Sequence, residues 1–286
     1  MRNLAQPQGW ISETRRGASR AALASVAVLL LGMVATQSAQ AQTLRVLHAF
    51  TKSDGANPYA GLIRDAKGNL YGTTLFGGNP GGGTVFKLDT KGTEKVLYGF
   101  AGGNDGAQPY AGLVLDPAGT LYGTTFFGGT GNGNSCAGGC GTLFKVTKAG
   151  KETVLHSFCS VDNCADGGSP IAGLVLDKKG NLYGATNVGG AHDLGTVFKL
   201  DKSGKETVLH SFAGGMTDGA NPYYVGLLMD EAGNLYGATL LGGDLSCNAG
   251  VGCGVVFKVD TNGRETVLHR FAGGTTDGCY PLRNVG

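Results

Sequence analysis

The chain contains seven cysteines, and their spacing in the sequence restricts the chemistry they can take part in. Close pairs of this kind are typical of local disulfides in an exported protein, where each bridge would pin the loop that holds it. A zinc site built from the first two pairs is the alternative. We expect three disulfides and a last cysteine that has lost its partner where the chain ends. The cysteines are Cys136/Cys140, Cys159/Cys164, Cys247/Cys253 and the single Cys279.

Five aspartates, each followed by glycine, recur at regular intervals. Two kinds of chemistry fit them. A ring of carboxylates on one face could attract a cation, whereas an aspartate side chain can also accept hydrogen bonds from the amides of its own turn. We favour the turn role and keep these positions as candidates for a binding face. They are Asp54, Asp105, Asp166, Asp218 and Asp277.

Four of the five histidines occupy one repeated position, where Tyr98 stands once in place of histidine. A single active site needs one such group, so the repetition favours a structural role. His192 stands alone in a glycine-rich segment and is a candidate ligand or acid–base group, with a solvated loop residue as the plain alternative. No nucleophile–base pair, HExxH sequence or phosphate-binding loop occurs. We therefore predict no catalytic residue, metal or cofactor.

The elements that must position these residues recur four times. Residues 173–212 (GLVLDKKGNLYGATNVGGAHDLGTVFKLDKSGKETVLHSF) contain four short apolar runs separated by turn residues, which indicates four strands. The equivalent tyrosines, Tyr71, Tyr122, Tyr183 and Tyr236, are 51, 61 and 53 residues apart, a spacing typical of propellers. We expect an orphan strand at 43–50, units at about 51–100, 101–158, 159–212 and 213–271, and a partial fifth unit at 272–286.

The connections within each unit are of two kinds. The first and third are short turns of nearly constant length, such as Asp177–Asn181, while the second and fourth vary in length and content. In an up-and-down sheet, alternate connections lie at the same end. The variable loops should therefore share one face of the molecule, the kind of face on which binding usually occurs.

Four four-stranded units predict an all-β fold, a β-propeller in which stacking of neighbouring blades builds the core. The ends fit either a four-bladed ring with spare edges or an incomplete, open ring, and exposed edges could pair in a homodimer. The recurring blocks P-x-A-G-L-x-x-D-x-x-G-N-L-Y-G-T-T, G-T-V-F-K-L and E-T-V-L-x-x-F, over roughly residues 43–278, resemble the Gloeo/Verruco (GloVer) repeat family of secreted bacterial proteins. That resemblance implies propeller-like repeats and no particular activity.

Residues 1–41 form a predicted signal peptide. Arginines at 15, 16 and 20 precede an apolar run at 21–35, and Ala39-Gln40-Ala41 fits a cleavage site. The apolar run is shorter than the roughly 20 residues of a membrane span, so we expect no stable span after cleavage. The Arg15-Arg16 pair fits twin-arginine export less well than the general route, because a bulky apolar residue is missing after it.

Cleavage also changes the charge. Without four arginines and Glu13, the chain keeps 19 basic and 20 acidic residues. This near-neutral balance gives no long-range attraction to nucleic acid or anionic lipid. We expect a secreted, periplasmic or extracellular protein with no nucleic-acid partner.

Two classes of function remain. One is a binding or interaction scaffold that presents its variable-loop face to a glycan or a protein; a purely structural cell-surface repeat is a third possibility. The other is an enzyme, a lyase or hydrolase at the central channel. An enzyme should break the repeat with unique His, Glu, Arg or Tyr residues, whereas the deviations here are mainly Gly, Asn, Ser and Cys, with His192 the exception. Binding is therefore favoured.

Overall fold

The computed structural model describes residues 44–131, 133, 136, 138–223 and 226–281. The chain divides into two units, Met1–Val46 and Leu47–Gly286. The described part of the first unit, residues 44–46, holds no helix or strand, and the predicted signal peptide lies outside the described residues. Within the described ranges, no helix has the length and apolar character needed to cross a membrane.

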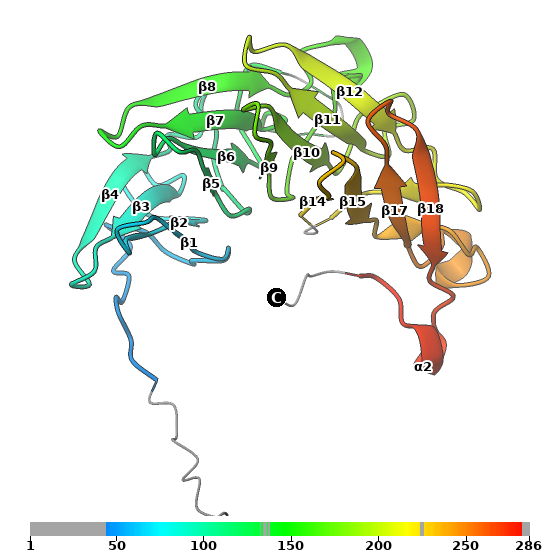
Figure 1. The fold of residues 1–286 in the computed structure, drawn as a ribbon, viewed down its shortest axis with the longest axis horizontal. Helices are drawn as coiled ribbons and strands as arrows, with labels where there is room; N and C mark the ends of the chain where they lie inside the picture. The colour runs from blue at the N-terminus through cyan, green and yellow to red at the C-terminus, as the bar shows by residue number, and fades with distance from the viewer. Residues whose placement is uncertain (1–43, 132, 134–135, 137, 224–225, 282–286) are drawn as a thin grey trace, which may run out of the picture. The chain divides into compact units, whose positions relative to one another are not determined.

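Four antiparallel sheets follow one another along the second unit, and in each the strands pair in sequence order (Figure 1). This confirms the all-β class and the β-propeller architecture, with each sheet forming one blade. The strands are β1 Ile63–Arg64, β2 Leu70–Thr74, β3 Thr84–Leu88 and β4 Glu94–Gly99; β5 Val114–Leu115, β6 Leu121–Thr125, β7 Thr142–Val146 and β8 Glu152–Ser157; β9 Val175–Leu176, β10 Leu182–Thr186, β11 Thr196–Leu200 and β12 Glu206–Ser211; β14 Leu228–Met229, β15 Leu235–Ala238, β17 Val255–Val259 and β18 Glu265–Arg270.

Short elements complete the loops. A two-stranded sheet pairs β13 (Gly219–Ala220) with β16 (Leu241–Gly242). Single turns of 3-10 helix occur at η1 (Asp162–Cys164) and η2 (Asn248–Gly250), and the one-turn helix α2 spans Gly274–Asp277.

The core lies between neighbouring blades. The third strand of each blade is largely buried. The phenylalanine that ends one blade packs edge-to-face on the phenylalanine of the next third strand, a favoured aromatic geometry. The ring centroids are 5.0 Å apart for Phe50–Phe86 and Phe100–Phe144, and 5.1 Å apart for Phe158–Phe198 and Phe212–Phe257.

The orphan strand expected at 43–50 does not form a strand. Residues 44–50 have no ladder partner among the described residues, so their backbone groups make no sheet hydrogen bonds; residue 43 lies outside those residues. Phe50 nevertheless occupies the position of a blade-ending phenylalanine, because its ring packs on Phe86. The end of the segment thus keeps the packing contact of a blade-ending phenylalanine without the strand pairing, while Leu44, Val46 and Leu47 stay exposed.

The partial fifth unit begins as the earlier units do. Tyr280 N–H donates to the carbonyl of Cys253 (3.1 Å), as Gln108 N–H donates to that of Gly82 (2.8 Å). A Cβ placed on Gly254 would lie 3.2 Å from Pro281, and one on Gly83 would lie 2.9 Å from Pro109. The start of each unit is thus held closely against the preceding blade. Residues 282–286 lie outside the described ranges.

The variable loops of each blade are joined by backbone pairing. The loop that enters the blade pairs with the loop between its second and third strands, and the strand order puts both at the end opposite the tight turns. The pairs are Ala56–Phe76, Ala107–Phe127 and Gly168–Val188, and in the fourth blade β13 with β16. These loops therefore form one ordered surface, here called the loop face.

Candidate functional site

Each of the five Asp-Gly aspartates accepts hydrogen bonds at the start of its loop. Asp54 accepts from Thr51 N–H (2.8 Å) and contacts His48 Nε2 (3.0 Å). Asp105 accepts from Ala101 N–H (2.8 Å) and from the Tyr98 hydroxyl (2.9 Å). The remaining three contact the repeated histidine and a loop amide in the same way: Asp166 with His156 and Ser160, Asp218 with His210 and Ala213, and Asp277 with His269 and Ala272.

The first four aspartates each lie near the fourth-strand glutamate of the blade that their loop enters. In Glu94, Glu152, Glu206 and Glu265, one side-chain oxygen is buried with no hydrogen-bond partner. Burial, and then the negative charge of Asp105, raises the pKa of Glu152 to about 7. The Thr51 amide lowers the pKa of Asp54, so that this aspartate stays charged in the same kind of cluster. In that cluster burial, and then the charge of Asp54, raises the pKa of Glu94, so the pKa values of its two carboxyl groups are shifted in opposite directions.

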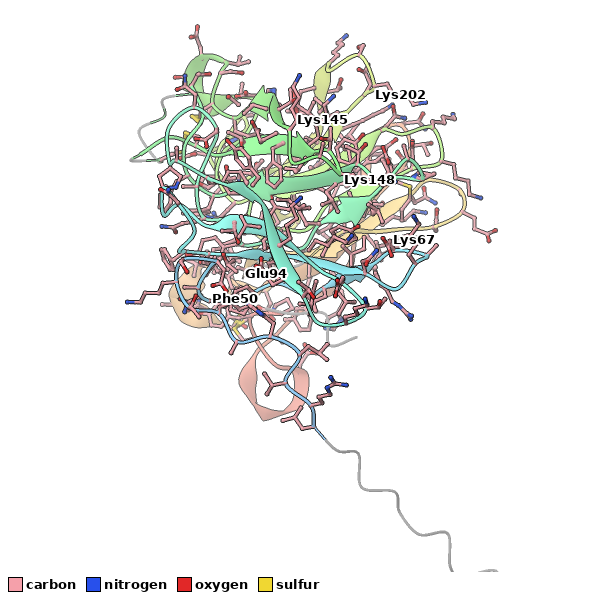
Figure 2. The ribbon with its side chains drawn as sticks, turned by 90° about the vertical axis from the view of Figure 1, so that its left-hand side faces the viewer. Phe50, Lys67, Glu94, Lys145, Lys148 and Lys202 are labelled. Carbon is pink, nitrogen blue, oxygen red and sulfur yellow. A yellow bond between two sulfur atoms is a disulfide. The ribbon has the colours of Figure 1, made fainter. Side chains whose placement is uncertain are left out.

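The first of these clusters is the tightest. Ligand atoms of His48, Asp54 and Glu94 all lie within 4.8 Å of one another, and no other His–Asp–Glu set in the described ranges gathers so closely. Figure 2 labels Glu94 and Phe50 in this region, with Lys67, Lys148 and Lys202 of the tight turns toward the other side of the view. The contacts of Asp54 with the Thr51 amide and His48 explain this cluster as a turn cap without a cation.

His192 is exposed in the loop between β10 and β11. Its neighbours organise that loop: Gly189 N–H donates to Asp193 Oδ1 (2.8 Å), and Ala191 N–H donates to Ser211 Oγ (2.7 Å).

The cysteines gather into two clusters on the loop face. The four-cysteine cluster holds the disulfides Cys136–Cys140 and Cys159–Cys164, with 3.7 Å between the sulfurs of Cys136 and Cys159. The three-cysteine cluster consists of Cys247, Cys253 and Cys279, in which the sulfur of Cys253 lies within disulfide reach of both of the others. Cys279, which we expected to have no partner, lies close to Cys253 because the start of the fifth unit folds back onto the fourth blade.

Sequence reasoning missed a cluster of aromatic residues on the loop face. Tyr59 and Tyr110 stand at the same repeat position, just before the first strand of blades one and two, and their rings are 5.9 Å apart. Tyr110 also contacts Phe126 at 5.5 Å, and Phe126 contacts Phe127 at 4.5 Å. We call this set, together with Phe76, the aromatic cluster.

Part of the aromatic cluster faces solvent. Tyr59 is 42% exposed and Phe76 is 44% exposed, and Phe76 pairs through its backbone with Ala56, which precedes Tyr59 in the same loop. Burial, and then the nearby hydroxyls of Tyr223 and Tyr59, raises the pKa of Tyr110. The signal was present in the sequence: the position after the repeated proline is Tyr59, Tyr110, Ile171 and Tyr223.

A groove of about 890 Å³ lies at the opposite end, between the tight turns of blades three and four. Its walls combine apolar side chains such as Leu209, Leu228 and Met229 with both lysines and carboxylates. The mixed charge selects no class of ligand, so the groove is not favoured as the site.

The fold and the loop face together define a propeller built from sequence repeats. A family model for the Gloeobacter/Verrucomicrobia repeat matches residues 30–164 and 126–285. The chain therefore belongs to this repeat family, as its recurring blocks predict.

Solved structures with similarity to the chain include enzymes. A gluconolactonase from Xanthomonas campestris is 16% identical, with a TM-score of 0.45 over 74% of this chain and 62% of that protein. A luciferin-regenerating enzyme is 15% identical, with a TM-score of 0.44 over 73% and 60%. A protein of unknown function from Dyadobacter fermentans is 14% identical, with a TM-score of 0.45 over 74% and 68%. This chain thus spans less than two thirds of the first two proteins. A search of curated proteins found no match.

Proposed function

We propose that this protein is a secreted binding protein whose loop face recognises carbohydrate through the aromatic cluster. The observation that supports it is the exposure of Tyr59 and Phe76 beside the half-buried Tyr110. Large exposed aromatic side chains on a rigid surface are typical of interaction sites. An aromatic ring packs well on the apolar C–H face of a sugar, while the tyrosine hydroxyl offers a hydrogen-bond partner to the sugar hydroxyls.

The scaffold suits such a site. Tyr59 and Tyr110 are anchored next to prolines that start their blades, and Pro109 packs closely on Gly83 of the preceding blade. Backbone pairing between Ala56 and Phe76 holds the other side of the surface. Side chains held in this way lose little conformational entropy on binding, which favours affinity.

The alternative, a lyase or hydrolase, is less well supported. The repeated histidines and aspartates on the loop face are engaged with one another and with turn amides. His192 is exposed, and its sequence neighbour Asp193 accepts a hydrogen bond from the Gly189 amide. A stacking surface needs none of these groups, so binding accounts for more of what the loop face contains.

Affinity electrophoresis through gels containing soluble polysaccharides tests the proposal, with isothermal titration calorimetry on any polysaccharide that retards the protein. We expect retardation by at least one polysaccharide, and affinity about tenfold weaker in Tyr59→Ala and Phe76→Ala, because each loses a stacking ring. Analysis of the same mixtures for shortened or unsaturated products separates binding from the enzyme alternative.

Leu228→Ala is the matched control. Leu228 is also an exposed apolar side chain, at 61%, but it lies beside the groove at the tight-turn end. This variant should bind as the unaltered protein does. Equal weakening in Leu228→Ala and Tyr59→Ala, or no retardation by any polysaccharide, would contradict the proposal.

A further inference from the structure

The three-cysteine cluster contains one sulfur more than its disulfides can use. The sulfur atoms of Cys247, Cys253 and Cys279 all lie within 4.8 Å of one another, and Cys253 is in disulfide contact with each of the other two. One cysteine sulfur forms one disulfide at a time. The two pairings are therefore alternatives, and each of them leaves the third cysteine of the cluster outside the disulfide.

The backbone fits either pairing. The Cα atoms of Cys253 and Cys247 are 6.0 Å apart, and those of Cys253 and Cys279 are 4.7 Å apart. Both separations lie within the range of about 4.4–6.8 Å usual for disulfides. The hydrogen bond from Tyr280 N–H to the Cys253 carbonyl fixes the loop that carries Cys279 against the fourth blade. Neither pairing requires the chain to move far.

The structure also accommodates the cysteine that is left unpaired. Cys247 Sγ lies 3.2 Å from the Asp244 carbonyl and is oriented to donate a hydrogen bond to it, which is the contact of a thiol. Cys253 is buried, whereas Cys247 and Cys279 are half-buried. The buried central sulfur is thus shared, and the free thiol falls on one of the two more accessible positions.

The four-cysteine cluster provides an internal contrast. It has an even number of sulfurs, and each is paired within its own loop, Cys136 with Cys140 and Cys159 with Cys164. All four of these cysteines are buried. It leaves no thiol, although it occupies the same kind of place, between the long loop of one blade and the start of the next unit.

We propose that Cys247, Cys253 and Cys279 form a thiol–disulfide exchange site in which Cys253 alternates between two partners. The Cys279 thiolate attacks Cys253 Sγ, a new Cys253–Cys279 bond forms, and the Cys247–Cys253 bond breaks. Cys247 leaves as a thiolate and takes a proton from solvent, so the exchange consumes no oxidant or reductant. In one state the start of the fifth unit is tied covalently to the fourth blade, and in the other it is held by hydrogen bonds.

The free thiol also makes the cluster a modification site for small disulfides. The thiolate attacks one sulfur of a low-molecular-weight disulfide, forms a mixed disulfide with that half, and releases the other half as a thiolate. The disulfide within the cluster stays intact in this step. The ligand class is therefore a small organic disulfide.

Alkylation of the native full chain, purified without reductant, tests the exchange. N-ethylmaleimide is added at once, and the labelled positions are mapped by mass spectrometry after digestion. We expect one label per chain, divided between Cys247 and Cys279, with Cys253 and the four-cysteine cluster unlabelled. Label on Cys253, label confined to one cysteine, no label, or three labels with release of bound zinc would each overturn the proposal.

Incubation with glutathione disulfide tests the modification. The unaltered chain should gain the mass of one glutathionyl group, whereas Cys247→Ser and Cys279→Ser should gain none, because each leaves an even, fully paired set. Cys253→Ser should carry two alkylated thiols instead of one. An adduct on Cys247→Ser or Cys279→Ser would contradict the assignment if the circular dichroism of that variant matches the unaltered chain. If a variant fails to fold, the alkylation mapping on the unaltered chain still tests the proposal.

Discussion

At the scale of single residues, the carboxyl groups between the blades couple charge to stability. Burial raises the pKa of Glu206 to about 7, and burial with the charge of Asp105 raises that of Glu152 to about 7, from 4.5. A carboxyl with a raised folded-state pKa contributes stability that is complete below its unfolded pKa and is lost as the pH rises through the folded one. These glutamates therefore weaken the fold between about pH 4.5 and 7.

We predict that Glu152→Gln and Glu206→Gln raise the melting temperature by a few degrees at pH 8 and change it less at pH 5. The amide stays neutral at both values, so it removes the cost of a buried charge only where the glutamate would be ionised. Differential scanning calorimetry across this range provides the measurement. Glu231→Gln, on an exposed turn residue, is the control, and an equal gain at both pH values would contradict the prediction.

The turn aspartates differ between blades in a way that is also measurable. Asp177 accepts hydrogen bonds from Asn181 N–H (2.8 Å), from Asn181 Nδ2 (2.7 Å) and from the Tyr183 hydroxyl (3.2 Å). In the second blade, Thr120 replaces the asparagine, and Asp116 lacks the side-chain amide contact. The same turn is thus held by more hydrogen bonds in the third blade.

We predict that Asp177→Ala destabilises the protein by about 1–3 kcal/mol and Asp116→Ala by less, because fewer donors lose their acceptor in the second case. Urea unfolding of the two variants, followed by circular dichroism, measures the difference. A larger loss in Asp116→Ala would show that the asparagine contact contributes nothing.

At the scale of the strand, the side chains packed around the second strand of each blade explain why it contains a glycine. A Cβ on Gly184 would lie 2.6 Å from the Cζ of Phe198 and 3.0 Å from Leu174. The ring of Phe198 crosses the strand at this point, and there is no room for a methyl group. The L-Y-G-x-T block of the repeat therefore has a packing reason for its glycine.

We predict that Gly184→Ala destabilises the protein by about 1–3 kcal/mol through overpacking. Gly103→Ala should be near neutral, because a Cβ placed on Gly103 would have no other atom within 4 Å. Thermal unfolding of both variants is the measurement. A destabilisation shared by the two would mean that backbone freedom, rather than the Phe198 contact, decides the effect.

At the scale of the whole molecule, stability comes from contacts between neighbouring blades. Phe158 is fully buried between the second and third blades. Phe271 holds the equivalent place after the fourth blade but is only half-buried. In a repeat protein, each interface between neighbouring repeats adds to the free energy of unfolding. A phenylalanine buried between two blades should therefore contribute more than one at the end of the array.

We predict that Phe158→Ala destabilises the protein by about 3–5 kcal/mol, as expected for a buried ring, and Phe271→Ala by clearly less. Hydrogen exchange measured by mass spectrometry should show faster exchange in the second and third blades of Phe158→Ala. Equal destabilisation by the two variants would contradict a fold stabilised by interblade packing.

The sequence alone predicted the strands and tight turns because the same pattern of residues occurs four times. Alternation of apolar residues, the Asp-x-x-Gly turns and the equivalent positions of Tyr71, Tyr122, Tyr183 and Tyr236 are local features, and local features determine strands and tight turns. The short first and third turns of each unit also predicted that the strands they join pair with each other. The repeated histidines and aspartates were also visible as positions.

Tertiary structure decided what those positions contact. The sequence did not show that Glu94 of one blade lies against Asp54 of the preceding segment, that Tyr59 and Tyr110 meet across two blades, or that Cys279 reaches Cys253. Residues 44–50 carry the pattern of a strand but form none, because a strand needs a partner to hydrogen bond with. Each of these outcomes depends on which segments stack beside each other, and that is set by interblade packing rather than by the local pattern.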